Sequence, residues 1–302
     1  MFGVAIHGGA GALTPGLYSQ EEEKSFQQQL RTIINTAHDS LSNGEKALNV
    51  VTSAVKSLED SPLFNAGRGS VFDANGEITM DASVMCGQTL RVGGVAQLKI
   101  IKNPIEAARW VLEHSRHSII AREFLESHLK QIGLTCETPD YFKVDKRYQQ
   151  YLEAKAQGKV VLDHGSQDSN TVGAVARDRH GNLAAATSTG GLTGKFPGRI
   201  SDSSLCGSGT YANNATCALS ATGTGDVFMQ MHLCHNVHAL MTYAHLSLQE
   251  ACEKSLVELQ RLGGMGGVIA IDRNNEIFMP FNSPGMFRAE RSQGAMAQVH
   301  IY

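Results

Sequence analysis

The chain has 302 residues, of which 42% are hydrophobic and only 6% aromatic, with 31 glycines and a formal net charge of -3 at pH 7. This composition is sufficient for a large core of small aliphatic side chains connected by many tight turns. The weak net charge gives no electrostatic signature of binding to nucleic acid or to an anionic membrane, so we expect a protein that acts on a small molecule.

The N-terminal residues predict neither a secretion signal nor a membrane anchor. Residues 1–6 run directly into strand-like sequence, without the charged and long apolar regions of a signal peptide. No apolar run approaches the length of a membrane span, and the six cysteines are scattered singly without CxxC pairs. We therefore expect a cytoplasmic protein with reduced thiols.

A glycine-rich motif, His7-Gly8-Gly9-Ala10-Gly11, follows the first strand-like run. It does not match the dinucleotide-binding fingerprint, because residue 14 is threonine rather than glycine and no acidic residue follows at the expected distance. We interpret it as a tight turn in which bulky side chains would not fit against a neighbouring strand.

The rest of the first half alternates between strand and helix patterns. A loop at residues 61–70 has glycines beside Asn65, which indicates a close backbone approach or carbonyl groups turned toward an ion. Residues 138–163 are charged and less regular. The expected elements are helices at 21–40, 44–59, 104–116 and 118–131 and strands at 70–72, 78–84 and 90–101.

Thr171 lies at the most informative boundary of the chain. Residues 164–170 are polar and aperiodic, which is typical of a mobile surface segment, whereas a strand-like apolar run begins at Thr171. A chain cut at such a boundary would leave a fixed new terminus. A threonine there could use its own α-amine, which titrates near pH 7.7 to 8.0, to activate its hydroxyl. An ordinary strand threonine is the alternative.

The second half contains two further groups of polar residues. Arg199 and Asp202 could hold the carboxylate and the ammonium of an amino acid, or form a surface ion pair of little consequence. Thr222 and Gly223 end a strand before a helix, where a hydroxyl and a backbone N–H can stabilise an oxyanion. The expected elements are strands at 171–176, 183–188, 217–221, 267–271, 276–281 and 297–301 and helices at 226–244 and 247–261.

Three histidines lie on the first of these helices, at His232, His235 and His238. Their spacings of three and six place them on one side of a helix, which favours a metal site. No carboxylate and no HExxH motif accompanies them, so we prefer a cluster of satisfied histidines on the helix face.

The order of the predicted elements indicates an α+β fold. Strands at both ends of each half, with helices grouped between them, suggest two packed, mainly antiparallel sheets flanked by helices, a four-layer αββα sandwich. Each half contributes strands to a shared core, so we expect residues 1–302 to form a single domain.

Several motifs together resemble the plant-type L-asparaginase and isoaspartyl peptidase family of N-terminal nucleophile hydrolases. The resemblance covers nearly the whole chain, in order and at family-like spacing. The residues that carry it are His7-Gly8-Gly9-Ala10-Gly11, Phe64-Asn65-Ala66-Gly67-Arg68-Gly69, Thr171-Val172-Gly173-Ala174-Val175-Ala176, Ala186-Thr187-Ser188-Thr189-Gly190-Gly191, Pro197-Gly198-Arg199, Ser201-Asp202-Ser203, Tyr211-Ala212-Asn213-Asn214 and Thr222-Gly223-Thr224-Gly225.

The resemblance implies a precursor that cuts itself between Asn170 and Thr171. The products would be an α subunit, residues 1–170, whose last part from about residue 150 is a flexible linker, and a β subunit, residues 171–302. Relatives usually have glycine before the nucleophile. We expect correct cleavage after Asn170, at a rate that its side chain could reduce by restricting the backbone.

The resemblance also implies acyl transfer through a covalent intermediate. The substrate would be a β-aspartyl dipeptide or L-asparagine, and the product would be L-aspartate. In the implied roles, Thr171 is the nucleophile, Thr189 orients its amine, Asn65 positions the nucleophile or the attacking water, Thr222 and Gly223 bind the oxyanion, Arg199 and Asp202 bind the substrate's α-carboxylate and α-ammonium, and Gly225 completes the binding site.

No catalytic cofactor is implied. The family wraps a structural sodium ion in main-chain carbonyls, and the mature enzyme is a dimer of αβ units. The sodium ligands would be the carbonyls of Leu58, Glu59, Ser61, Phe64, Ala66 and Arg68.

Three alternatives remain open at this stage. A glycosylasparaginase should carry a signal peptide and paired cysteines, and neither is seen. A Taspase-like endopeptidase would need to recognise a protein segment, against which the Arg199 and Asp202 pair argues. A non-enzymatic metal- or nucleotide-binding protein would use the histidine cluster and the glycine loops. The sequence does not decide between asparagine and the dipeptide, and we prefer the dipeptide.

Overall fold

The computed structural model describes residues 1–156 and 171–302. The expected cleavage residue Asn170 and most of the expected linker therefore lie outside the described residues. The helices are α1 (Gln20–Ser42), α2 (Ala47–Glu59), α3 (Pro104–His114), α4 (Arg122–Ser127), α5 (Leu129–Ile132), α6 (Pro139–Phe142), α7 (Asp145–Ala156), α8 (Gly225–Met231), α9 (Leu233–Tyr243) and α10 (Leu248–Arg261), with 3-10 turns η1 (Gly67–Gly69) and η2 (Asp202–Ser204). The strands are β1 (Gly3–Gly11), β2 (Met80–Cys86), β3 (Val92–Leu98), β4 (Ile119–Ala121), β5 (Val172–Arg177), β6 (Leu183–Thr189), β7 (Thr210–Ala212), β8 (Cys217–Gly223), β9 (Gly266–Asp272), β10 (Ile277–Phe278), β11 (Gly285–Ser292) and β12 (Gln298–His300).

These strands form two sheets. The larger runs in the order β12-β11-β1-β5-β6-β2-β3-β4, with antiparallel pairs up to β3 and a parallel pair between β3 and β4. The smaller runs in the order β10-β9-β8-β7 and is antiparallel. Strands of both halves of the chain contribute to the larger sheet, as expected for a shared core, whereas the strands of the smaller sheet all follow Thr171.

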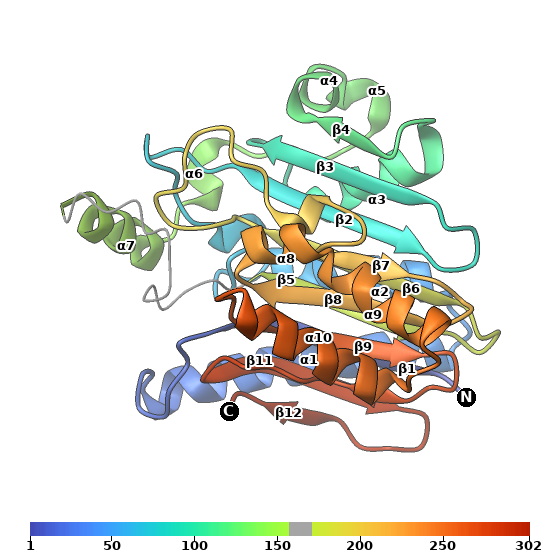
Figure 1. The fold of residues 1–302 in the computed structure, drawn as a ribbon. Coiled ribbons are helices and arrows are strands. Elements are labelled where there is room, and N and C mark those ends of the chain that lie inside the picture. The colour runs from blue at the N-terminus through green and yellow to red at the C-terminus, as the bar shows by residue number, and fades with distance from the viewer. Residues whose placement is uncertain (157–170) are drawn as a thin grey trace.

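The two sheets pack face to face between two layers of helices (Figure 1). Helices α1, α2 and α3 contact the outer face of the larger sheet, and α9 and α10 contact the smaller sheet. Strands β5 and β6 contact β8 across the space between the sheets. The four-layer αββα prediction is therefore confirmed.

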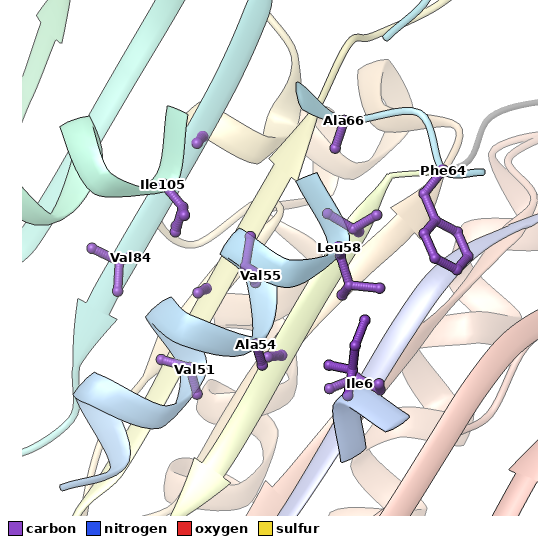
Figure 2. Close-up of a cluster of buried hydrophobic side chains, with 14 of the residues drawn as sticks. Ile6, Val51, Ala54, Val55, Leu58, Phe64, Ala66, Val84 and Ile105 are labelled. Carbon is purple, nitrogen blue, oxygen red and sulfur yellow. The ribbon is translucent and has the colours of Figure 1, made fainter. Parts of the chain in front are cut away.

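Alternation along each strand of the larger sheet separates a helix-side core from an inter-sheet core. In β5, Val172, Ala174 and Ala176 belong to the cluster under the helices, whereas Val175 belongs to the cluster between the sheets. Because the side-chain period of a strand is two, Thr171 also lies on the inter-sheet face. Figure 2 shows the helix-side cluster, with Val51, Ala54, Val55 and Leu58 of α2 beside Ile6 of β1, Val84 of β2, Ile105 of α3 and the loop residues Phe64 and Ala66.

The glycine motif after residue 7 lies within β1, so its interpretation as a turn was wrong. The pairing of β1 with β11 shifts register between His7 and Gly9, which is a β-bulge, and Gly9 has a φ of 117°. The expected close approach is confirmed, because a Cβ atom at Gly8 would lie 2.4 Å from the ring of Phe64.

Other differences come from tertiary contacts that the local pattern does not contain. The helix predicted at 118–131 is replaced by β4, α4 and α5, because residues 119–121 pair with β3. The helix predicted at 226–244 is broken at His232, which has a φ of 48° and separates α8 from α9. Strand β11 was not predicted, since Arg288, Glu290 and Arg291 interrupt its apolar pattern. Helix α7 extends to Ala156, into the segment expected to be a flexible linker.

No helix among the described residues is long and apolar enough to cross a membrane.

Candidate active site

Thr171 directly precedes β5, and its hydroxyl points at the end of β6. The pairing of Val172 with Ser188 places Thr171 beside Thr189, and Thr171 Oγ1 donates to Thr189 Oγ1 at 3.1 Å. Thr189 Oγ1 also accepts from the N–H of Gly191 at 2.9 Å. Thr171 is 8% exposed and Thr189 is 2% exposed. The expected nucleophile and its expected partner are thus in direct contact at the mouth of the inter-sheet layer.

Asn65 holds the turn that follows Thr189, at Gly190 and Gly191. Its Nδ2 donates to the carbonyl of Gly191 at 2.7 Å, and its Oδ1 accepts from the N–H of Val71 at 3.0 Å. The main-chain carbonyl of Asn65 also accepts from the N–H of Gly190 at 3.0 Å. Asn65 is therefore one contact away from Thr189, and the structure shows no direct bond from it to Thr171.

Thr222 and Gly223 end β8 on the same side of the molecule. Thr222 Oγ1 accepts from the N–H of Ala10 at 3.1 Å, which fixes the hydroxyl oxygen at the end of β1. Gly223 has a φ of 145°, and a Cβ atom there would lie 2.2 Å from the carbonyl oxygen of Met265. Only glycine can occupy this position without displacing backbone.

Arg199 and Asp202 lie next to Gly225, at the start of α8. A Cβ atom at Gly225 would lie 2.1 Å from Asp202 Oδ1 and 3.6 Å from Arg199 Nη2. Arg199 Nη2 contacts Asp226 Oδ2 at 2.9 Å. Arg199 and Asp202 are therefore not a simple surface ion pair with one another.

The carboxyl group of Asp202 is buried, has a raised pKa and has one oxygen without a hydrogen-bond partner. Burial raises the pKa of its carboxyl to about 7, Arg199 opposes this shift, and Asp226 and Asp81 add to it. Its Oδ2 atom has no hydrogen-bond partner within residues 1–156 and 171–302. A buried carboxylate without a partner is costly, so the site is suited to receive a cationic ligand.

Several contacts link these residues. Thr171 contacts Thr189, which contacts Gly191, and a Cβ atom at Gly191 would lie 3.2 Å from Arg199 Nη1. Arg199 and Asp202 both approach Gly225, which follows Gly223 by two residues. Thr222 is held by the N–H of Ala10 in β1, the strand whose His7 contacts the carbonyl of Thr171.

Two further residues at this site were not predicted. His7 Nδ1 donates to the carbonyl of Thr171 at 2.9 Å. Lys195 is 2% exposed, and its ammonium donates to the carbonyls of Thr79 and Gly190, both at 2.8 Å. Burial lowers the pKa of Lys195 to about 8, with Arg199 adding to the shift and Asp81 and Asp73 opposing it. A lysine in a loop usually extends into solvent, so its sequence contained no signal of this burial.

The loop after α2 turns several carbonyl groups toward two glycines. A Cβ atom at Gly67 would lie 2.4 Å from the carbonyl oxygen of Glu59, and one at Gly69 would lie 2.0 Å from that of Phe64. Glycines at these positions let the carbonyl-bearing segments approach closely.

The histidines near α9 do not form a metal site. His238 Nδ1 lies 2.7 Å from Thr216 Oγ1, and His235 packs edge-on against Tyr211. Across residues 1–156 and 171–302 no group of three or more His, Cys, Asp or Glu side chains could hold a metal ion. The preference for a histidine cluster without a metal stays a prediction, and His232 lies at the break between two helices rather than within one.

Comparison with known proteins places this geometry in context. A family model described as asparaginase matches residues 2–301. An isoaspartyl peptidase of Salmonella typhimurium is 46% identical over 99% of this chain and 98% of its own length, and an isoaspartyl peptidase of Escherichia coli is 46% identical over 99% and 95%. A probable isoaspartyl peptidase/L-asparaginase of Arabidopsis thaliana is 35% identical over 99% and 98%.

Proposed function

The chain belongs to the asparaginase family, and from this we infer that it is an isoaspartyl peptidase and L-asparaginase, which releases L-aspartate from β-aspartyl dipeptides and from asparagine. The observation that carries the assignment to this site is the direct contact of Thr171 Oγ1 with Thr189 Oγ1. The half-buried Arg199 and the buried Asp202 supply groups of both charges near the turn that follows Thr189.

Maturation comes first in the proposed mechanism. Thr171 Oγ attacks the carbonyl carbon of residue 170, the peptide bond becomes an ester, and water hydrolyses this ester. The products are the carboxylate of an α subunit, residues 1–170, and the free α-amine of a β subunit that begins at Thr171. This amine is the base that an internal threonine lacks.

In the catalytic cycle, the α-amine takes the proton of Thr171 Oγ as the oxygen attacks the substrate's β-carbonyl carbon. Thr222 Oγ and the N–H of Gly223 stabilise the oxyanion, a role in which the loss of one donor typically reduces kcat by about 10² to 10³. The leaving ammonia or amino acid takes the proton. Water then attacks the acyl-enzyme ester, and aspartate leaves with Thr171 restored. Thr189 holds the nucleophile in place, and Asn65 supports the turn after Thr189.

The aspartyl part of the substrate binds in the charged half of the site. Arg199 takes the α-carboxylate, and Asp202 accepts from the α-ammonium beside Gly225. Both substrates share this part, so the leaving group decides the preference. We propose that the dipeptide is preferred. Comparing kcat/KM for β-aspartyl-leucine and asparagine tests this, and equal or better use of asparagine would overturn it.

Two features of the assembly are proposed from the family. A sodium ion would be held by main-chain carbonyls of Leu58, Glu59, Ser61, Phe64, Ala66 and Arg68, where it would stabilise the loop that carries Asn65 without entering the chemistry. The crowding of carbonyl oxygens around Gly67 and Gly69 supports this proposal. The mature enzyme would be a dimer of αβ units.

The variant Thr171→Ala tests the mechanism most directly. We expect the purified variant to remain at full length on a denaturing gel and to hydrolyse neither substrate, whereas the wild-type chain gives two fragments and turns over both. A wild-type chain that stays intact and is nevertheless fully active would disprove the mechanism. A binding protein without enzymatic activity would be unaffected by the change.

A further inference from the structure

A series of buried hydroxyl groups lies between the two sheets, directly beneath the nucleophile. His7 Nε2 lies 2.8 Å from Ser220 Oγ, and Ser220 Oγ lies 2.7 Å from Thr187 Oγ1. Thr210 Oγ1 donates to Thr187 Oγ1. His7, Thr187, Ser220 and Thr210 are all 0% exposed. These residues belong to β1, β6, β8 and β7, so the series connects both sheets.

The chemistry of these groups fixes the direction of the hydrogen bonds from Ser220 through His7 to Thr171. A carbonyl oxygen can only accept, so His7 Nδ1 carries a proton that it donates to the carbonyl of Thr171 at 2.9 Å. Burial lowers the pKa of His7 to about 3, so the ring is neutral near pH 7 and its Nε2 is an acceptor. Ser220 must then donate to Nε2, and its oxygen can only accept from Thr187. The proton of Ser220 thus points toward the nucleophile's residue, whereas Thr187 has one proton for two acceptors, Ser220 Oγ and the carbonyl of Gly209 at 3.1 Å.

Gly173 leaves the space that this series needs. A Cβ atom at Gly173 would lie 1.9 Å from Ser220 Oγ and 2.3 Å from His7 Nε2. Any side chain at this position of β5 would separate the two groups. The contact between His7 and Ser220 therefore requires a glycine at position 173, two residues after the nucleophile.

We propose that His7, held in its Nδ1-protonated form by Ser220, is a positioning residue that fixes the carbonyl of Thr171 and thereby the direction of the nucleophile's hydroxyl and amine. After cleavage Thr171 has no preceding peptide, so the rotation about its Cα–C bond determines where its amine lies relative to β5. The bond from His7 restrains that rotation. This inference rests on the proposed function of Thr171.

Substitution of Ser220 tests the inference, with Ser255 as a matched control. Ser255 is a buried serine of α10, 1% exposed, whose Oγ donates to the carbonyl of Ala251. With β-aspartyl-leucine as substrate we expect Ser220→Ala to lower kcat about tenfold and to leave KM within twofold. Ser220→Cys, which keeps a weaker donor, should recover part of kcat. Ser255→Ala should leave both constants within twofold. Equal kcat in wild type and Ser220→Ala, or a change in KM alone, would overturn the inference.

A second measurement reads the protonation of His7 in the wild-type protein and uses one variant only to assign the signal. Nitrogen-15 spectra of the wild-type protein labelled on histidine should show one neutral ring that is protonated on Nδ1 and does not titrate between pH 5 and 8. That signal should be missing in His7→Gln. If His7 is protonated on Nε2, or titrates near its ordinary value, the inference is wrong. If the wild-type protein instead hydrolyses neither substrate, the proposed function fails, while the spectra still report on the series of hydroxyl groups.

Discussion

The two sides of the site differ in how completely their polar groups are satisfied. On the nucleophile side, Thr171, Thr189 and His7 form hydrogen bonds with one another or with nearby main chain. On the charged side, Asp202 Oδ2 and Arg199 Nε are buried without partners within the described residues. Hydrogen bonds to all its polar atoms hold a reacting group in one place, whereas buried polar atoms without partners are ready to bind a ligand. We therefore expect substitutions on the nucleophile side to lower mainly kcat and substitutions on the charged side to raise mainly KM.

Thr189 provides the largest expected effect on the nucleophile side. We expect Thr189→Val to lower kcat about 10²-fold, because Thr171 loses the hydroxyl partner that orients it, an effect at the lower end for groups that assist proton transfer. KM should change less than threefold. Ser188→Ala is the matched control, since Ser188 is the preceding residue of β6, faces the opposite side of the sheet and is equally buried. A change confined to KM in Thr189→Val would contradict the division of roles.

Asp202 provides the largest expected effect on the charged side. A hydrogen bond to a charged group contributes about 1.5–3 kcal/mol, so Asp202→Asn should raise KM by roughly 10- to 100-fold, with a smaller change in kcat. Because burial raises the pKa of Asp202 to about 7, its ionised form is lost as the pH falls below about 7. The wild-type KM should therefore rise toward low pH.

The same pH series provides the control for Asp202. In Asp202→Asn the residue carries no titrating carboxyl, so the increase of KM below pH 7 should disappear, while any dependence of kcat on the α-amine of Thr171 should remain. An unchanged acid dependence of KM in the variant would show that another group binds the substrate's ammonium.

Lys195 lies between the nucleophile side and the charged side of the site, so its substitution should affect both kcat and KM. It ties Gly190, the residue after Thr189, to Thr79, and its charge lies beside Arg199. We expect Lys195→Met to lower kcat/KM about tenfold at pH 7, shared between the two constants. Burial lowers the pKa of Lys195 to about 8, so the wild-type kcat/KM should also decline as the pH rises through this value. Lys195→Arg stays protonated and should lack this decline; a decline that persists would exclude Lys195 as its source.

The proposed site residues could be named from the sequence, whereas several of the elements that carry them could not. The motif residues were identified through the resemblance to a known family, whose motifs are short and continuous in the sequence. Strand β11 was missed and the helix at 118–131 was wrong, since pairing with β1 and β3 decides those segments. His7 and Lys195 were missed for a related reason. Their roles depend on burial and on contacts with residues far away in the chain, for example the 164 positions between His7 and Thr171.

Asp226 gives the smallest expected effect and the finest test of the charged side. It pairs with Arg199, but its side chain is 47% exposed, and exposed ion pairs contribute little. Asp226→Asn should therefore change KM less than threefold at pH 8. Asp226 also contributes to the raised pKa of Asp202, so its neutralisation should move the acid-side increase of KM to lower pH. If KM instead rises strongly at pH 8, Asp226 rather than Asp202 is the main partner of the substrate's ammonium.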